Sequence, residues 1–198
     1  MGKTFYKASH SAAQFVKRGY GQVEPNHLSA QRTAQIYAQL PAKEDIEILE
    51  NGQFVKYDYS KGVVDFEGKG EWMMVFNEVK LYDDKWREQY KDFAMIKSNY
   101  TKGSDYSHEG YGPFKGQMTP RVIKTNVGDI YTTNCLELGN TSGKAKVQGT
   151  EDLSVGDVLS PNAQGYLSKT GDGTVKFEVV KIYTMADGQA AVKLMRIA

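Results

Sequence analysis

Apolar and polar residues alternate through much of the chain after residue 45, which is the pattern of half-buried β-strands. The first strands that this pattern predicts cover residues 46–49, 54–59, 63–66 and 72–76. Asn51-Gly52 separates the first two, and Asn-Gly favours a hairpin turn because both central residues need a positive φ. We therefore predict a β-meander that begins with a hairpin.

A second β-rich region covers residues 120–198 and contains a weak internal repeat. The stretch 127–134 recurs as 155–162, with four of eight positions identical. Gly-Asp before an apolar residue indicates a tight turn that leads into a strand. The repeat therefore predicts two equivalent corners of one small barrel, in preference to a ligand site. The chain then ends in a predicted hairpin with arms at 175–182 and 190–197.

Two segments have helical periodicity. Residues 29–40 begin with Ser29, a suitable N-cap, and end before Pro41. Residues 82–97 place three aromatic side chains at helical spacing behind two aspartates. A short helix is predicted in each segment.

Two further segments fit neither period and are candidate contact regions. Residues 1–27 predict an extended arm whose aromatic rings either dock on a neighbour or fold back on their own domain. Residues 98–120 predict a long loop rich in tyrosine and glycine, and such loops are often functional or linkers. The candidate contact residues are Lys3, Phe5, Tyr6, Phe15, Lys17, Arg18 and Tyr20 in the arm and Tyr106, Tyr111 and Phe114 in the loop.

Charge changes the picture of the arm. The whole chain has a formal charge of +1, but residues 1–40 hold five basic side chains and one acidic side chain. A basic leader binds either phosphate or an acidic protein surface. The absence of a basic run favours the protein surface. Nucleic acid is not an expected partner, because few basic residues lie among the rings of the loop.

These elements predict a mainly β protein with small barrel or sandwich lobes, an extended N-terminal arm and one or two short helices. The expected divisions are 1–41 for the arm and helix, 42–119 for a β-meander lobe with the aromatic loop, and 120–198 for a small barrel-like lobe. The 198 residues, of which 40% are hydrophobic, suffice for a core without covalent staples.

Motifs of catalysis and metal binding are absent from the sequence. Cys135 is the only cysteine, so an internal disulfide is excluded, and we expect it to be a buried apolar residue. The three histidines, His10, His27 and His108, have no metal-ligand spacing. A P-loop, a dinucleotide fingerprint and a Gly-x-Ser-x-Gly motif are also missing. We expect a protein that is not an enzyme and needs no cofactor.

Two alternatives remain open. Trp72, Tyr106 and Tyr111 could stack on sugars, which would make the chain a carbohydrate-binding module. Glu67 and Glu71, beside Trp72, could form the paired carboxylates of a small glycoside hydrolase.

Apolar runs are too short for a membrane span or a signal peptide. We expect no membrane contact. The expectation is a protein that is made inside a cell and either stays there or leaves within a larger particle.

The carboxyl-terminal pattern resembles small β-rich virion proteins of tailed bacteriophages, in particular auxiliary or decoration proteins of capsids. The resemblance is carried by Val-Gly-Asp-Val-Leu-Ser-Pro-Asn at 155–162, by Gly-Tyr-Leu-Ser at 165–168, and by the closing run 177–188. It covers residues 120–198 well and the rest loosely. It implies a subunit that binds and stabilises a capsid through the major capsid protein or other virion proteins. It also implies a homo-oligomer or symmetric array, assembled in the bacterial cytoplasm and carried in the virion, without catalytic residues.

Overall fold

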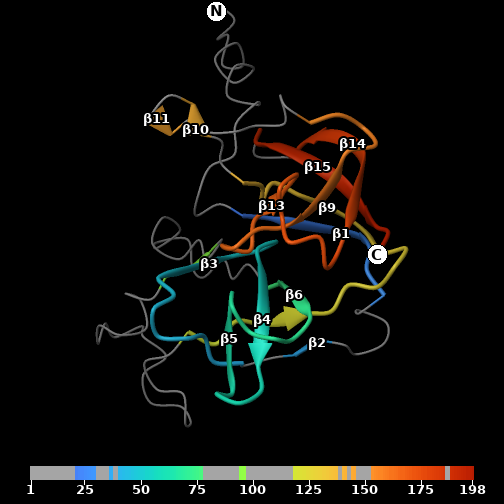
Figure 1. The fold of residues 1–198 in the computed structure, drawn as a ribbon. Coiled ribbons are helices and arrows are strands. Elements are labelled where there is room, and N and C mark those ends of the chain that lie inside the picture. Colours follow the sequence, from blue (N-terminus) through green and yellow to red (C-terminus); the bar gives the residue numbers. More distant parts are fainter. Residues whose placement is uncertain are drawn as a thin grey trace, which may run out of the picture.

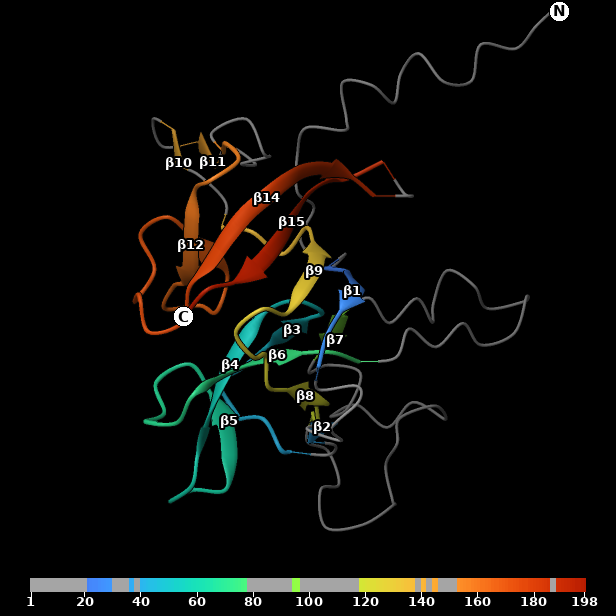
Figure 2. The same cartoon turned by 90° about the vertical axis from the view of Figure 1, so that its right-hand side faces the viewer.

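The computed structural model describes residues 21–29, 36–37, 40–77, 94–96, 118–137, 140–141, 144–145, 153–185 and 188–198. Within these ranges the chain forms strands and turns and contains no helix. Most strands belong to two larger sheets, which Figures 1 and 2 show packed one above the other. The mainly β class predicted from the sequence is confirmed.

The strands of the amino-terminal part are β1 (Val23–His27), β2 (Ile36–Tyr37), β3 (Ile48–Glu50), β4 (Phe54–Asp58), β5 (Val63–Asp65), β6 (Trp72–Val75) and β7 (Ala94–Ile96). The carboxyl-terminal part contributes β8 (Val122–Ile123), β9 (Ile130–Thr133), β10 (Asn140–Thr141), β11 (Lys144–Ala145), β12 (Val158–Pro161), β13 (Leu167–Ser168), β14 (Phe177–Thr184) and β15 (Ala190–Arg196).

The larger sheet has six antiparallel strands in the order β1-β9-β15-β14-β12-β13. Its centre is the predicted terminal hairpin, β14–β15, which is confirmed. The sheet also turns back on itself, because Leu136, just after β9, forms a parallel bridge with Leu167 of β13. The Glu137 N–H donates to the Leu167 carbonyl at 2.9 Å, which links the two sides of a barrel-like curl.

The second sheet has five strands in the order β2-β8-β6-β4-β5. Strand β4 pairs with β5 on one side and with β6 on the other, so the predicted meander is wrong. Strand β8 comes from the region assigned to the carboxyl-terminal lobe, yet it pairs with β6. The boundary expected between residues 119 and 120 therefore does not separate the two sheets.

The Asn51-Gly52 turn is present, but the predicted hairpin is wrong. Gly52 has φ of 89°, and the Gln53 N–H donates to the Glu50 carbonyl at 3.1 Å. Strand β3 nevertheless pairs with β7, and β4 pairs with β5 and β6. Strand β6 prevents the hairpin by pairing with the chain just after the turn. The Gly52 N–H donates to the Val75 carbonyl at 2.9 Å, and the Val75 N–H donates to the Gln53 carbonyl at 2.8 Å. These bonds align the chain after the turn with β6 instead of with β3.

Both predicted helices are replaced by strands where the structure describes them. Within 29–40, Ile36 pairs with Ile123 as part of β2 and β8. Within 82–97, β7 pairs with β3. Long-range pairing overrides the weak local preference for helix in these two places. Most of both segments lies outside the described residues.

Residues 21–27, predicted as the end of the extended arm, instead belong to the body. Strand β1 pairs antiparallel with β9 at the edge of the six-stranded sheet. Pro25 and a register irregularity between Glu24 and His27 interrupt this edge, which limits the addition of a further strand. The earlier part of the predicted arm, 1–20, lies outside the described residues.

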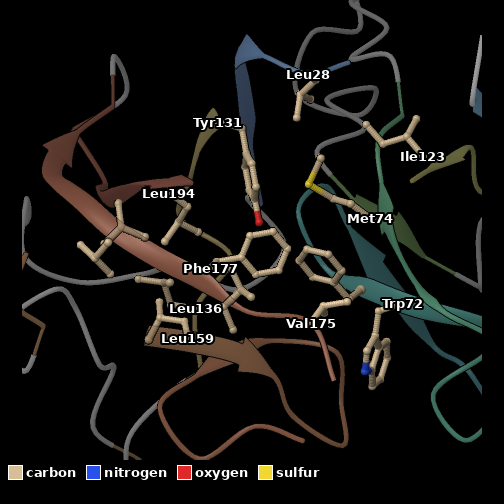
Figure 3. Packing of buried hydrophobic residues seen from close by; sticks show 14 residues of the cluster. Leu28, Trp72, Met74, Ile123, Tyr131, Leu136, Leu159, Val175, Phe177 and Leu194 are labelled. Carbon is tan, nitrogen blue, oxygen red and sulfur yellow. The ribbon is translucent and has the colours of Figure 1, made fainter. Parts of the chain in front are cut away.

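The two sheets share one hydrophobic core (Figure 3). Phe54 of the second sheet lies 5.3 Å from Phe177 of the first, measured between ring centroids, and Tyr131 meets Phe177 edge-on at 5.6 Å. Trp72, Met74 and other residues of the second sheet join Leu159 and Leu194 in the same cluster. A second, smaller hydrophobic cluster packs around Leu49 of β3 and Val55 of β4. Cys135 is buried, with 1% exposure, as predicted.

Candidate functional site

The ten predicted contact residues all lie outside the described part of the chain. They are Lys3, Phe5, Tyr6, Phe15, Lys17, Arg18 and Tyr20 in the arm and Tyr106, Tyr111 and Phe114 in the loop. The structure does describe how the chain on the body side of these segments is held. The described residues nearest to them are Gly21, directly after the arm, and strand β7 and Met118, on either side of the loop.

Gly21 and Gln22 fix the base of the arm to the body. The Gly21 N–H donates to Oε1 of Glu50 at 3.2 Å, and the Gln22 N–H donates to Oδ1 of Asn134 at 2.8 Å. A side-chain carbon on Gly21 would lie 2.6 Å from the backbone oxygen of Asn51, closer than real contacts allow. Only glycine fits there, so the chain passes tightly over the Glu50–Asn51 backbone.

Glu50 joins three parts of the molecule. Its side chain is buried, with 1% exposure, and its Oε2 accepts a hydrogen bond from the Tyr166 hydroxyl at 2.8 Å. Its backbone is the register partner of Ala94 in β7, the strand that precedes the aromatic loop. Gly21, at the base of the predicted arm, and strand β7 therefore meet at one residue: Gly21 binds the Glu50 carboxylate, and β7 pairs with its backbone. The sequence analysis missed this role, because Glu50 ends strand β3 beside the Asn51-Gly52 turn and the donors to its side chain are distant in the chain.

The polar side chains next to Glu50 are also satisfied. The Oδ1 of Asn51 accepts the Asn77 N–H at 2.7 Å, and its Nδ2 donates to the Asn77 carbonyl at 3.2 Å. The Glu50 N–H donates to Oε1 of Gln53 at 3.0 Å. A buried network with its partners in place holds one conformation, so Gly21 and Gln22 are attached to a rigid part of the body.

The Val-Gly-Asp repeat forms two matching turns, which confirms the predicted equivalence. Asp129 accepts the Asn126 N–H at 2.8 Å, and Asp157 accepts the Ser154 N–H at 2.7 Å. Gly128 and Gly156 have φ of 90° and 94°, in the left-handed region that favours glycine. The valine before each glycine is exposed, Val127 by 68% and Val155 by 65%.

The match extends into the sheet. The Gly128 N–H donates to the Arg196 carbonyl and the Gly156 N–H to the Val179 carbonyl, each at 2.8 Å. After the turns, β9 pairs with β15 and β12 pairs with β14 in corresponding registers. The four strands thus have an approximate twofold axis that passes between Glu178 and Met195, which are partners in the central hairpin.

Trp72 is not available for stacking on a sugar, so that part of the carbohydrate-binding alternative is wrong. Its side chain is buried, with 2% exposure, and its indole Nε1 donates to Oδ2 of Asp172 at 2.6 Å. The Lys56 ammonium lies 4.4 Å from the ring centroid and 3.4 Å from Asp172. Partial burial raises the pKa of Asp172, but hydrogen bonds from Thr174 and Trp72 and the charge of Lys56 outweigh burial and lower it.

Glu67 and Glu71 do not have the environment of a general acid. Glu71 lies 2.7 Å from the Lys124 ammonium and 3.1 Å from Arg196. Burial acts to raise the pKa of Glu71, but these two cations outweigh it and hold the pKa below its usual value, the opposite of what a proton donor needs. The Glu67 side chain is 83% exposed and lies 3.8 Å from Lys43. The structure thus gives each carboxylate a cation as its partner.

Among the described residues, His, Cys, Asp and Glu do not gather in a group that could hold a metal ion. His27 is exposed in β1, and His10 and His108 lie outside the described residues. In that same part of the chain no helix is long and apolar enough to cross a membrane.

Comparison with known proteins found no match of the chain to a family model, a curated protein or a solved structure.

Proposed function

We propose that the chain is a virion structural protein, an auxiliary or decoration subunit that binds and stabilises the capsid of a tailed phage. The resemblance that suggests this role is carried by residues 155–162, 165–168 and 177–188. In the structure these residues supply one Val-Gly-Asp turn, strands β12 and β13, and the first arm of the central hairpin. The resemblance therefore concerns the framework of the larger sheet.

The observation that carries the proposal is the anchoring of the arm at Glu50. A segment that binds a neighbouring subunit contributes to the shell only if its base is fixed to a rigid body. Gly21 and Gln22 supply such a base through hydrogen bonds to Glu50 at the end of β3 and to Asn134 directly after β9. A contact made by residues 1–20 would thus pull on the core of the protein and not on a loose tail.

The body has the links between sheets that a reinforcing subunit needs. Glu50 binds Tyr166, Trp72 binds Asp172, and Glu71 binds Arg196, each with one partner in either lobe. Together with the shared core, these bonds oppose movement of one sheet past the other. A partner held by the arm would therefore be held by the whole protein.

The expected partners are the major capsid protein or other virion proteins, with assembly in the bacterial cytoplasm and final location in the virion. The proposal assigns no catalytic residue, cofactor, nucleic acid or membrane to the chain. The arm residues from Lys3 to Tyr20 are its first contact surface, and the loop from Tyr106 to Phe114 is its second.

Deletion of residues 1–20 is the test, since a longer deletion would remove β1 from its own sheet. We expect the truncated protein to keep the unfolding midpoint of the intact chain but to stop co-sedimenting with capsids of the phage that encodes it. A second variant with serine at Phe5, Tyr6, Phe15 and Tyr20 keeps the basic residues and separates the effect of the rings from that of the charges. Undiminished co-sedimentation of the truncated protein would contradict the proposal.

A further inference from the structure

The outer face of the larger sheet carries a row of three apolar side chains and one carboxylate across the approximate twofold axis. Ile130, Met195, Glu178 and Val158 are cross-strand partners on four adjacent strands. Their neighbours along the strands, such as Tyr131, Leu194 and Phe177, are buried in the core. Because side chains alternate along a strand, the row lies on the opposite face.

This outer row is incompletely covered by the described residues. Val158 is 42% exposed, and Ile130, Met195 and Glu178 are partly buried. Ile197, two residues beyond Met195 and therefore on the same face, is 37% exposed. A cluster of partly exposed aliphatic side chains around one carboxylate is unusual for a face that meets only solvent.

Besides the negative charge of Glu178, the same face carries positive charges. Lys193 lies two residues before Met195, and its register partner is Lys181, so a row of two lysines follows the apolar row. Glu178 has no ion-pair partner within the described part of the chain. Lys181 lies 5.8 Å from the centroid of the Tyr183 ring and is exposed. The face thus offers a carboxylate and an ammonium about two residues apart along the strands, and neither forms an ion pair with another described residue.

We propose that this face binds a second copy of the same chain, with Glu178 of each copy against Lys181 of the other. A twofold interface requires a surface that is complementary to itself, and a face with both charges in adjacent rows meets that requirement. A twofold axis parallel to the rows and midway between them places each Glu178 opposite a Lys181. The aliphatic stem of Lys193 then lies over Met195 of the other copy. This inference does not depend on the proposed virion role.

The size of the face predicts a weak dimer. Four strands about 4.8 Å apart and about five residues long present roughly 300–400 Å² in projection. A standard interface buries about 800 Å² on each partner. We therefore expect a dissociation constant in the micromolar range, so that the dimer appears as the concentration rises.

The test is sedimentation equilibrium over a concentration series. It compares the intact chain with variants in which the charges of Glu178 and Lys181 are reversed singly and together. Glu178→Lys and Lys181→Glu should each weaken the dimer by about tenfold or more, because attraction becomes repulsion at two symmetric sites. The double variant restores both ion pairs in exchanged form and should regain most of the lost affinity. Lys69→Glu, at an exposed position between β5 and β6, is the matched control and should leave the dimer unchanged.

A second measurement needs no variant. Hydroxyl-radical oxidation of Met195 should fall as the protein concentration rises, whereas Met185, which is 2% exposed, should stay protected throughout. A chain that is monomeric at all concentrations overturns the proposal. So does a dimer that the single variants leave intact, or a double variant that is no tighter than the single ones.

Discussion

The indole nitrogen of Trp72 lies 2.6 Å from the carboxylate of Asp172, and this hydrogen bond joins the two larger sheets. Trp72 belongs to β6, and Asp172 lies in the connection between β13 and β14. Asp172 also accepts the Thr174 N–H at 2.9 Å and the Thr174 hydroxyl at 2.8 Å. One carboxylate therefore holds both its own turn and the neighbouring sheet.

Replacing Asp172 with alanine should lower the free energy of unfolding by about 1–3 kcal/mol, because a buried indole N–H loses its acceptor. Urea denaturation measures this loss. Asp45→Ala is the control, since Asp45 pairs with Lys43 at the surface, and exposed pairs contribute less than about 1 kcal/mol. A double-mutant cycle with Trp72→Phe isolates the coupling, and additive losses would mean that the two residues act separately.

Removing the Tyr131 hydroxyl should not lower the free energy of unfolding, in contrast to the replacement of Asp172. Tyr131 is fully buried, and its hydroxyl has no hydrogen-bond partner within the described part of the chain. Tyr131→Phe removes the unsatisfied group and keeps the edge-on packing against Phe177. We expect the variant to be as stable as the parent or more stable by up to about 1 kcal/mol in urea denaturation.

Tyr57→Phe is a suitable control, because Tyr57 is only partly buried. A loss of more than about 1 kcal/mol in Tyr131→Phe would indicate that a buried water or another group binds the hydroxyl. Tyr131→Leu should destabilise the protein, since it removes the ring that contacts Phe177.

The features that could be predicted from the sequence are those that local chemistry determines. Gly128 and Gly156 each need a positive φ, and the aspartate after each accepts an N–H three residues earlier. The information for these turns lies within four residues. The terminal hairpin is of the same kind, because its arms are close in sequence and its strands are long.

The features that could not be predicted depend on residues far apart in the chain. Hydrogen bonds between Val75 and the residues just before β4 align that strand with β6. The Glu50 side chain receives hydrogen bonds from residues 29 and 116 positions away. The carbohydrate-binding alternative needs an exposed Trp72, whereas its buried ring donates a hydrogen bond to Asp172, 100 positions away. Nothing in the local pattern around these residues distinguishes a satisfied buried group from an exposed one.

The two matching turns should differ in their contribution to stability. Asp129 is buried, with 2% exposure, and its Oδ1 accepts the Ser29 N–H at 2.9 Å in addition to the turn bond. Asp157 is more exposed and lies 2.7 Å from the Lys169 ammonium. Asp129→Ala should therefore cost about 1–3 kcal/mol in urea denaturation, and Asp157→Ala should cost less. Equal losses would show that the extra contact with Ser29 does not matter.

Acid should weaken the contact between the two lobes. The folded pKa values of Glu71 and Asp172 are lowered from 4.5 and 3.8, because each carboxylate interacts with cations or donors that outweigh the effect of burial. A lowered folded pKa means that the stabilisation is fully present above the unfolded value and is lost as the pH falls through the folded value. We expect the free energy of unfolding to decline below about pH 5.

Glu71→Gln should reduce the steepness of that decline in urea titrations at successive pH values. Glu67→Gln measures the effect of removing an exposed carboxylate, and an equal change in both variants would mean that Lys124 and Arg196 do not stabilise the charged form of Glu71.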